Sequence, residues 1–308
     1  MTSKADVTSL EKYKDSSHYR KIAQSAESLG LLEHLDRLDK DGYTIVPPEL
    51  VAPVDFRRRL LDAVLEVNER RTGHHIKAEE LATTQFDPEV PGRAHWGLLE
   101  EDPIFQEVIM NPAVLTMAKY LCGNSVLLSD MTGNLKQKHE RLTHPLHTDQ
   151  HGTPPPIPPY AQVANVTMTL TDYTQGDGVT AIVPGSQKKG RYPHPNEWDF
   201  RREDAPVKPI PLEAPAGSLL VWHGATWHGS FPRQNPGLRV NLIMVFTRVY
   251  MRQIRDFKST VSKEVLDLHG EEFAHLLGIN SMYPFDDLNP PSQEDNDYMM
   301  AAGYNPWA

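Results

Sequence analysis

The sequence contains a single cysteine, Cys122, among its 308 residues. One thiol can form neither an internal disulfide nor a cysteine-based metal cluster, so a reducing cytoplasm is the expected location. Long apolar runs are also missing. The stretch at residues 163–170 is far shorter than the roughly 20 residues that a spanning helix needs, and residues 1–11 lack the apolar region of a signal peptide. We therefore expect a cytoplasmic protein without a membrane span.

Positive charge is scarce as well. The chain has 31 basic and 41 acidic residues, which gives a net charge of −10. Its basic groups are short, as at residues 57–59 and 188–191, and clustered Lys and Arg are what phosphate neutralisation requires. Nucleic acid is therefore not an expected partner. The 39% hydrophobic content is enough for a folded core. The expected partner is a small-molecule substrate, and homo-oligomerisation is left open.

The apolar pattern changes near residue 124. Helical spacing marks residues 28–40, 53–71 and 102–121, whereas short runs rich in Val, Thr, Leu and Ile alternate with Gly and Pro turns from residue 125 onward. The second pattern is typical of a β-sandwich or barrel. Because no Gly/Ser-rich linker intervenes, we predict one domain, mainly β with flanking helices: a helical part at about 1–124, a β core at about 125–250, and a C-terminal helix and tail at 251–308.

Two short histidine motifs carry the chemistry. His147-Thr148-Asp149 would project an imidazole and a carboxylate from the same face of a strand, since side chains two residues apart point the same way. His228 follows 79 residues after Asp149. Two His and one carboxylate on one face of an octahedron leave three positions open, which is the ligand set of non-haem Fe(II) oxygenases. His223, five residues before His228, is a rival third ligand.

A candidate anion clamp lies eleven residues beyond His228. Arg239 could fold back beside the metal, where its rigid fork would bind a carboxylate through two hydrogen bonds. A keto acid that chelates iron at one end needs its far carboxylate held in this way. Lys136 or Lys138 could hold that carboxylate instead, and Arg239 would then be an ordinary strand residue.

Together these segments resemble the phytanoyl-CoA dioxygenase-like (PhyH) family of Fe(II)/2-oxoglutarate dioxygenases over residues 40–250. The resemblance rests on Lys40-Asp41-Gly42-Tyr43, His147-Thr148-Asp149-Gln150, Gly178-Val179-Thr180, Pro184-Gly185-Ser186, Gly217-Ser218-Leu219-Leu220, Trp227-His228-Gly229-Ser230 and Arg239. It implies a double-stranded β-helix, a jelly-roll barrel. It also implies that His147, Asp149 and His228 bind Fe(II) as the catalytic centre and that Arg239 binds 2-oxoglutarate, with Thr180 and Ser230 hydrogen-bonding it.

Three departures from the family pattern are visible. Gln187 stands where relatives commonly have His after Pro-Gly-Ser, and Gly176-Asp177-Gly178 stands in place of the usual Glu-Asn-Gly turn; neither touches the three ligand positions. His144 stands where several relatives place a Gln that contacts 2-oxoglutarate. Residues 72–96 are expected to form a lid over the barrel mouth, and the Pro-rich residues 151–160 a fixed wall.

The expected activity is oxidation of a C–H bond, by hydroxylation or a related outcome. 2-Oxoglutarate and O₂ are the cosubstrates, with succinate and CO₂ as products, and the primary substrate is expected to be compact and partly apolar. Two alternatives keep the same fold. One is a non-redox, metal-dependent cupin-like enzyme, in which Arg239 would have no function. The other is a jelly roll that binds a ligand without turnover.

Overall fold

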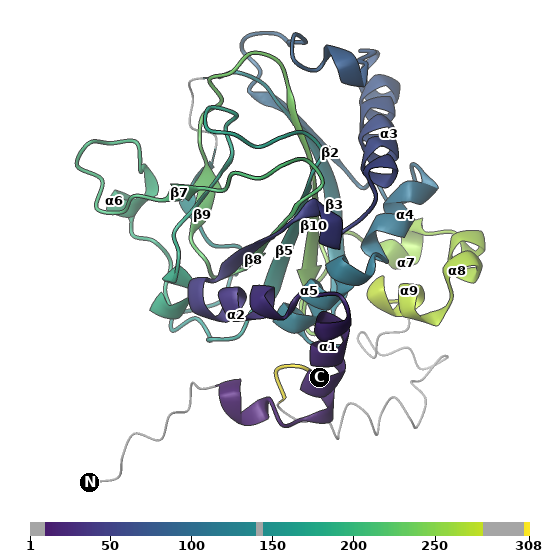
Figure 1. The fold of residues 1–308 in the computed structure, drawn as a ribbon, viewed down its shortest axis with the longest axis vertical. Helices are drawn as coiled ribbons and strands as arrows, with labels where there is room; N and C mark the ends of the chain where they lie inside the picture. The colour runs from purple at the N-terminus through teal and green to yellow at the C-terminus, as the bar shows by residue number, and fades with distance from the viewer. Residues whose placement is uncertain (1–9, 140–143, 280–304) are drawn as a thin grey trace.

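The computed structural model describes residues 10–139, 144–279 and 305–308 (Figure 1). Two antiparallel sheets form its centre. The larger has the order β1 (Tyr43–Val46), β8 (Leu219–His223), β5 (Val163–Thr169), β10 (Arg239–Thr247), β3 (Leu127–Lys136) and β2 (Gly92–Trp96). The smaller has the order β4 (His144–His147), β9 (His228–Ser230), β6 (Thr180–Ile182) and β7 (Ile210–Pro211). Because the chain crosses repeatedly between the two sheets, the predicted double-stranded β-helix is confirmed.

The central strands show why this sequence forms a barrel. In β5, Ala164, Val166 and Met168 alternate with Asn165, Thr167 and Thr169, and all of them are buried. Successive side chains of a strand point to opposite faces. The apolar set joins the main hydrophobic core. The polar set therefore faces the barrel interior, where a functional site has to be built.

Helices cover the outer face of the larger sheet (Figure 1). They are α1 (Ser17–Ser28), α2 (Leu32–Asp41), α3 (Val54–Thr72), α4 (Pro103–Ile109) and α5 (Pro112–Cys122). The predicted helices at residues 28–40, 53–71 and 102–121 are thus present, the last of them split into α4 and α5, with Asn111 accepting hydrogen bonds at the start of α5. Gly42 and Gly73 end α2 and α3 in the left-handed conformation, which glycine adopts without strain.

The remaining helices are short. They are α6 (Pro195–Trp198), α7 (Phe257–Thr260), α8 (Lys263–His269) and α9 (Glu271–Leu276). The last three lie in the region where a C-terminal helix was expected. Gly270, at a φ of 79°, separates α8 from α9. In the described part of the chain no helix is long and apolar enough to cross a membrane. The expected loop-like tail lies outside the described residues except for 305–308.

The segment between α3 and β2 does not lie where we expected it. The Leu238 amide donates to the Leu81 carbonyl at 2.7 Å, and the Gln137 side chain bonds the Phe86 amide and the Asp87 carbonyl. Leu238 and Gln137 directly adjoin Arg239 and Lys136. Residues 81–91 therefore close the Arg239 end of the barrel, and the expected lid over the metal ligands is not formed by them.

Candidate metal centre and cosubstrate site

The pairing of β4 with β9 brings the two predicted histidine ligands together. His147 and His228 are cross-strand partners, and their ring centroids lie 4.3 Å apart. His228 is buried, whereas His147 is partly exposed toward the interior. Two segments that are 81 residues apart in the sequence thus form one side of a site.

Asp149 completes the cluster just beyond the end of β4. Its amide donates to the Gly224 carbonyl at 2.8 Å, which fixes the backbone beside the start of β9. Its Oδ1 lies 3.5 Å from Nε2 of His147, and its Oδ2 lies 3.2 Å from Nε2 of His228. One donor atom from each of the three residues lies within 4.8 Å of the other two.

The surroundings orient these donor atoms. Nδ1 of His147 lies 2.8 Å from the Pro145 carbonyl, and Nδ1 of His228 lies 2.9 Å from the Thr226 carbonyl. A carbonyl can only accept, so each Nδ1 carries the proton and each Nε2 presents a lone pair. Asn165 donates its side-chain amide to Oδ2 of Asp149 at 2.7 Å. The donor set therefore fits a divalent transition metal such as iron.

The charges of the site favour a carboxylate ligand. Burial alone would raise the pKa of Asp149, but His228, His147 and His151 outweigh burial and hold that pKa well below its usual range. Burial also lowers the pKa of His147, and the hydrogen bond and charge of Asp149 reverse this effect and raise it. Asp149 is thus an ionised carboxylate with the imidazoles of His147, His151 and His228 around it.

The rival histidines are placed differently. His223 is buried at the end of β8, where its Nδ1 accepts from the Ala225 amide at 3.0 Å, and burial lowers its pKa to about 4. It is not part of the three-residue cluster. His144 pairs with Ser230 one step further along β4 and β9. His151 is exposed, and its Nε2 lies 3.6 Å from Oδ1 of Asp149.

Arg239 opens β10 at the other end of the interior. It is buried, donates to the Gly178 carbonyl and lies 4.5 Å from the Tyr173 ring centre. Its Nε is buried and has no hydrogen-bond partner within the described residues. A cation with an unused donor in a closed interior is a strong anion-binding element.

Lys136 lies beside Arg239, as its cross-strand partner on β3. Its ammonium group donates to the Phe231 carbonyl at 2.7 Å, to the Gly178 carbonyl at 3.1 Å and to the Ser230 hydroxyl. Thr180 is the cross-strand partner of Ser230. The structure thus brings Arg239, Thr180 and Ser230 into one group and adds Lys136, whereas Lys138 is exposed.

Asn165 was missed by the sequence reasoning. The alternation of Asn165, Thr167 and Thr169 with apolar residues signals a polar inner face. The pattern does not reveal that Asn165 binds Asp149, because the two residues come together only in the folded chain.

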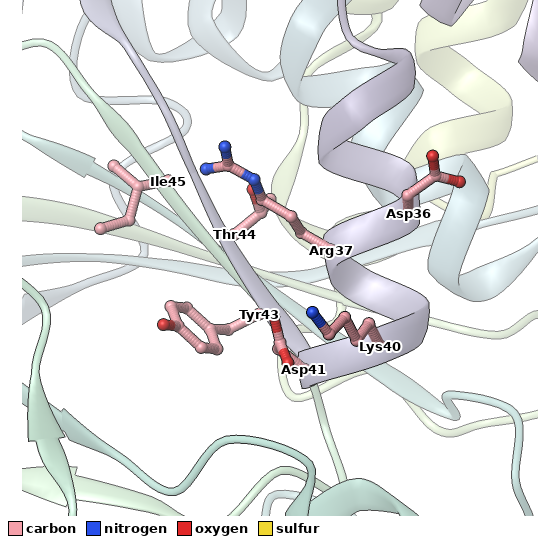
Figure 2. Close-up of a pocket in the computed structure, with 7 residues that line it drawn as sticks. All are labelled: Asp36, Arg37, Lys40, Asp41, Tyr43, Thr44 and Ile45. Carbon is pink, nitrogen blue, oxygen red and sulfur yellow. The ribbon is translucent and has the colours of Figure 1, made fainter.

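A separate groove of about 360 Å³ lies between α2 and β1 (Figure 2). Asp36, Arg37, Lys40 and Asp41 supply charges of both signs, and Tyr43, Thr44 and Ile45 supply the strand side (Figure 2). None of the three clustered ligands lines it. Tyr43 pairs with Trp222, whose ring lies 5.1 Å from that of His228, so the groove is separated from the cluster by the Trp222 side chain.

Known proteins share this arrangement. The model of the phytanoyl-CoA dioxygenase (PhyH) family matches residues 38–241, more than half of the chain. Dioxygenase af480 of Aspergillus fumigatus is 26% identical over 79% of this chain and 75% of its own length. L-proline trans-4-hydroxylase of Streptomyces griseoviridis is 24% identical over 72% of this chain and 88% of its own.

A solved structure has the same fold. HygX from Streptomyces hygroscopicus, with nickel and 2-oxoglutarate bound, has a TM-score of 0.56 and 16% identity over 78% of this chain and 94% of its own. The match of the family model over most of the barrel is what decides the assignment. The chain belongs to the phytanoyl-CoA dioxygenase family and is an Fe(II)- and 2-oxoglutarate-dependent dioxygenase.

Proposed function

We propose that the protein hydroxylates an unactivated C–H bond of a small organic molecule, with Fe(II) held by His147, Asp149 and His228. The observation that carries the proposal is the convergence of their three donor atoms within 4.8 Å, each oriented by a neighbour. Iron bound there, together with 2-oxoglutarate and O₂, supplies the oxidising chemistry.

The protein's own part is to position the two substrates. Arg239 and Lys136 bind the distal carboxylate of 2-oxoglutarate, and Ser230 and Thr180 offer hydroxyls beside it. Both side chains now donate to the Gly178 carbonyl, and neither has a carboxylate partner within the described residues. A carboxylate bound between Arg239 and Lys136 would accept hydrogen bonds from both side chains. Asp177, the nearest buried acid of this region, is already paired with Arg233 at 2.8 Å.

The proposal also includes the class of the primary substrate. HygX was solved with hygromycin B bound, and a hydroxylase of L-proline is among the relatives. Small organic molecules are therefore the class that we propose, acted on in the cytoplasm by a chain that works as one domain. The assembly state is testable by light scattering.

The proposal is tested by spectroscopy and by product formation. Anaerobic addition of Fe(II) and 2-oxoglutarate should produce a weak visible charge-transfer band, and O₂ should then yield succinate. Asp149→Ala should abolish both readouts while circular dichroism stays unchanged. His151→Ala, which removes an exposed neighbour of Asp149, is the matched control and should keep both.

The same experiment separates the two alternatives. A non-redox metal enzyme would show neither the charge-transfer band with 2-oxoglutarate nor succinate formation under O₂. A protein that only binds a ligand would show the band without turnover in the presence of every candidate substrate. Full succinate formation by the Asp149→Ala variant would refute the proposed ligand set.

A further inference from the structure

The inner face of the larger sheet is unevenly covered. On β5 and β8 its residues Thr167, Leu220 and Trp222 are buried. On β10 its residues Ile243 and Val245 are partly exposed, although β10 lies in the middle of the sheet. A side chain of a central strand stays exposed only where nothing packs on it. This half of the inner face is therefore open to an incoming molecule.

The open half adjoins the metal ligands. Asn165, which holds the Asp149 carboxylate, is the cross-strand partner of Val245, and Val245 is the partner of Asp130 on β3. Neighbouring strands are about 4.8 Å apart, so Asp130 lies roughly 10 Å across the sheet from Asn165. A molecule that lies on Ile243 and Val245 would reach from the metal toward β3.

A cation lies at the far side of this surface. The chain after β10 returns along β3, where the Arg255 amide donates to the Ser129 carbonyl at 3.0 Å. Nε of Arg255 lies 3.3 Å from Oδ1 of Asp130. A Cβ on Gly97 would lie 2.1 Å from Nη2 of Arg255, so only glycine lets the guanidinium lie against the end of β2.

Solvent reaches the positive member of this pair. The Arg255 side chain is 33% exposed and the Asp130 side chain 3%. Neither Nη group of Arg255 has a hydrogen-bond partner in the described chain, since only Nε is engaged. A guanidinium with unused N–H groups can bind a carboxylate through two hydrogen bonds.

An aromatic side chain borders the same surface. Trp96 ends β2 as the partner of Thr132, whose other partner is Ile243, so all three share the inner face. The residue is 50% exposed, and its backbone carbonyl accepts from Arg71 at 2.8 Å. A half-exposed indole is well suited to pack against an apolar ligand.

Resting on the proposed function, we propose that the primary substrate is a carboxylic acid with an apolar body. The body lies on Ile243, Val245 and Trp96, and the carboxylate is bound by Arg255, which contacts Asp130 at two strand spacings, roughly 10 Å, from Asn165. Asp130 neutralises part of the Arg255 charge, which favours a monoanionic carboxylate over a dianionic phosphate. The oxidised carbon is therefore remote from the acid group.

The test compares an acid with its neutral amide. 4-Phenylbutyrate and 4-phenylbutyramide are titrated calorimetrically, without O₂, into protein saturated with Fe(II) and 2-oxoglutarate, so that the Arg239 site is already filled. The acid should bind about tenfold more tightly or better, the usual gain from a hydrogen bond to a charged group. The charge-transfer band of the same sample reports separately whether the metal and cosubstrate sites are intact.

Variants locate the source of this preference. Arg255→Gln should abolish it, and Arg255→Lys, which keeps a charge beside Asp130, should retain part of it. Arg252→Gln, on the exposed side of the same segment, is the matched control and should retain all of it. Trp96→Ala should weaken the acid and the amide by the same factor.

The proposal fails on any of three results. The first is that wild-type protein binds the acid and the amide equally, or binds neither, while the band is present. The second is that the preference for the acid survives in folded Arg255→Gln protein. The third is that Arg37→Gln removes the preference instead, which would move the binding site to the groove of Figure 2.

Discussion

Lys136 makes 2-oxoglutarate binding dependent on pH. Burial, together with Arg239 and Arg233, lowers the pKa of Lys136 to about 6. At pH 7.5 most of this lysine is then uncharged in the empty site. A dicarboxylate placed beside the ammonium group favours the charged form. We therefore expect the protein to take up about one proton for each 2-oxoglutarate bound at pH 7.5.

The sign and size of the effect follow from this linkage. Below pH 6 the lysine is already charged, and binding needs no proton. Above pH 6 each further unit weakens the apparent affinity by up to tenfold, so at pH 7.5 it is roughly tenfold or more below its low-pH limit. The opposite slope, with affinity rising as the pH rises from 6.5 to 8, would refute the reasoning.

Calorimetry measures the proton directly. Fe(II)-loaded protein is titrated with 2-oxoglutarate under anaerobic conditions at pH 7.5 in buffers of different ionisation enthalpy. Lys136→Met should bring the uptake close to zero, and Lys138→Met, an exposed neighbour, should leave it unchanged. Arg233 is paired with Asp177, and His144 is another titratable group that faces Lys136. Uptake that persists in Lys136→Met and disappears in His144→Gln would assign the proton to His144.

Three further predictions concern single contacts. Asn165→Ala removes the amide that holds the Asp149 carboxylate, and Fe(II) affinity measured by metal titration should fall about 10- to 100-fold. Asp177→Ala leaves Arg233 buried without its carboxylate, and urea unfolding should show a loss of about 3 kcal/mol or more. Arg239→Ala should raise the apparent constant for 2-oxoglutarate roughly 30-fold or more in steady-state assays, with little change for the primary substrate.

The parts of the fold that were predictable are those in which neighbouring residues carry the signal. The strand at residues 43–46 and the helix at residues 53–71 appear within one residue of the expected bounds, because their apolar spacing and flanking glycines act locally. The C-terminal helix expected after the barrel is present as helical structure, but it is divided into α7, α8 and α9. Its apolar spacing continues across Gly270, but the backbone turns there with a φ of 79°.

The residues of the candidate site also divide into those that a local motif predicts and those that depend on strand pairing. His147 and Asp149 were found by their spacing of two residues, although Asp149 lies just beyond the end of β4, and His228 was found by its motif. Lys136 and Asn165 depend instead on strand register. Lys136 adjoins Arg239 only because β3 pairs with β10 in one alignment, and a shift of one residue would turn its side chain to the outer face. No pattern within either strand specifies that alignment.

The segment before β2 shows how register also decides what can recognise a substrate. A long polar stretch ahead of a barrel suggests a lid, yet β2 runs antiparallel to β3 from Gly92, opposite Lys136, to Trp96, opposite Thr132. Residues 81–91, which precede Gly92, therefore lie at the Arg239 end of the barrel. Only the other end of β2, at Trp96, reaches the half of the inner face beside the metal ligands. Arg255 arrives at that end from the opposite direction, along the start of β3. Selectivity for the primary substrate thus depends on where two segments flanking the barrel meet, and no single loop over its mouth accounts for it.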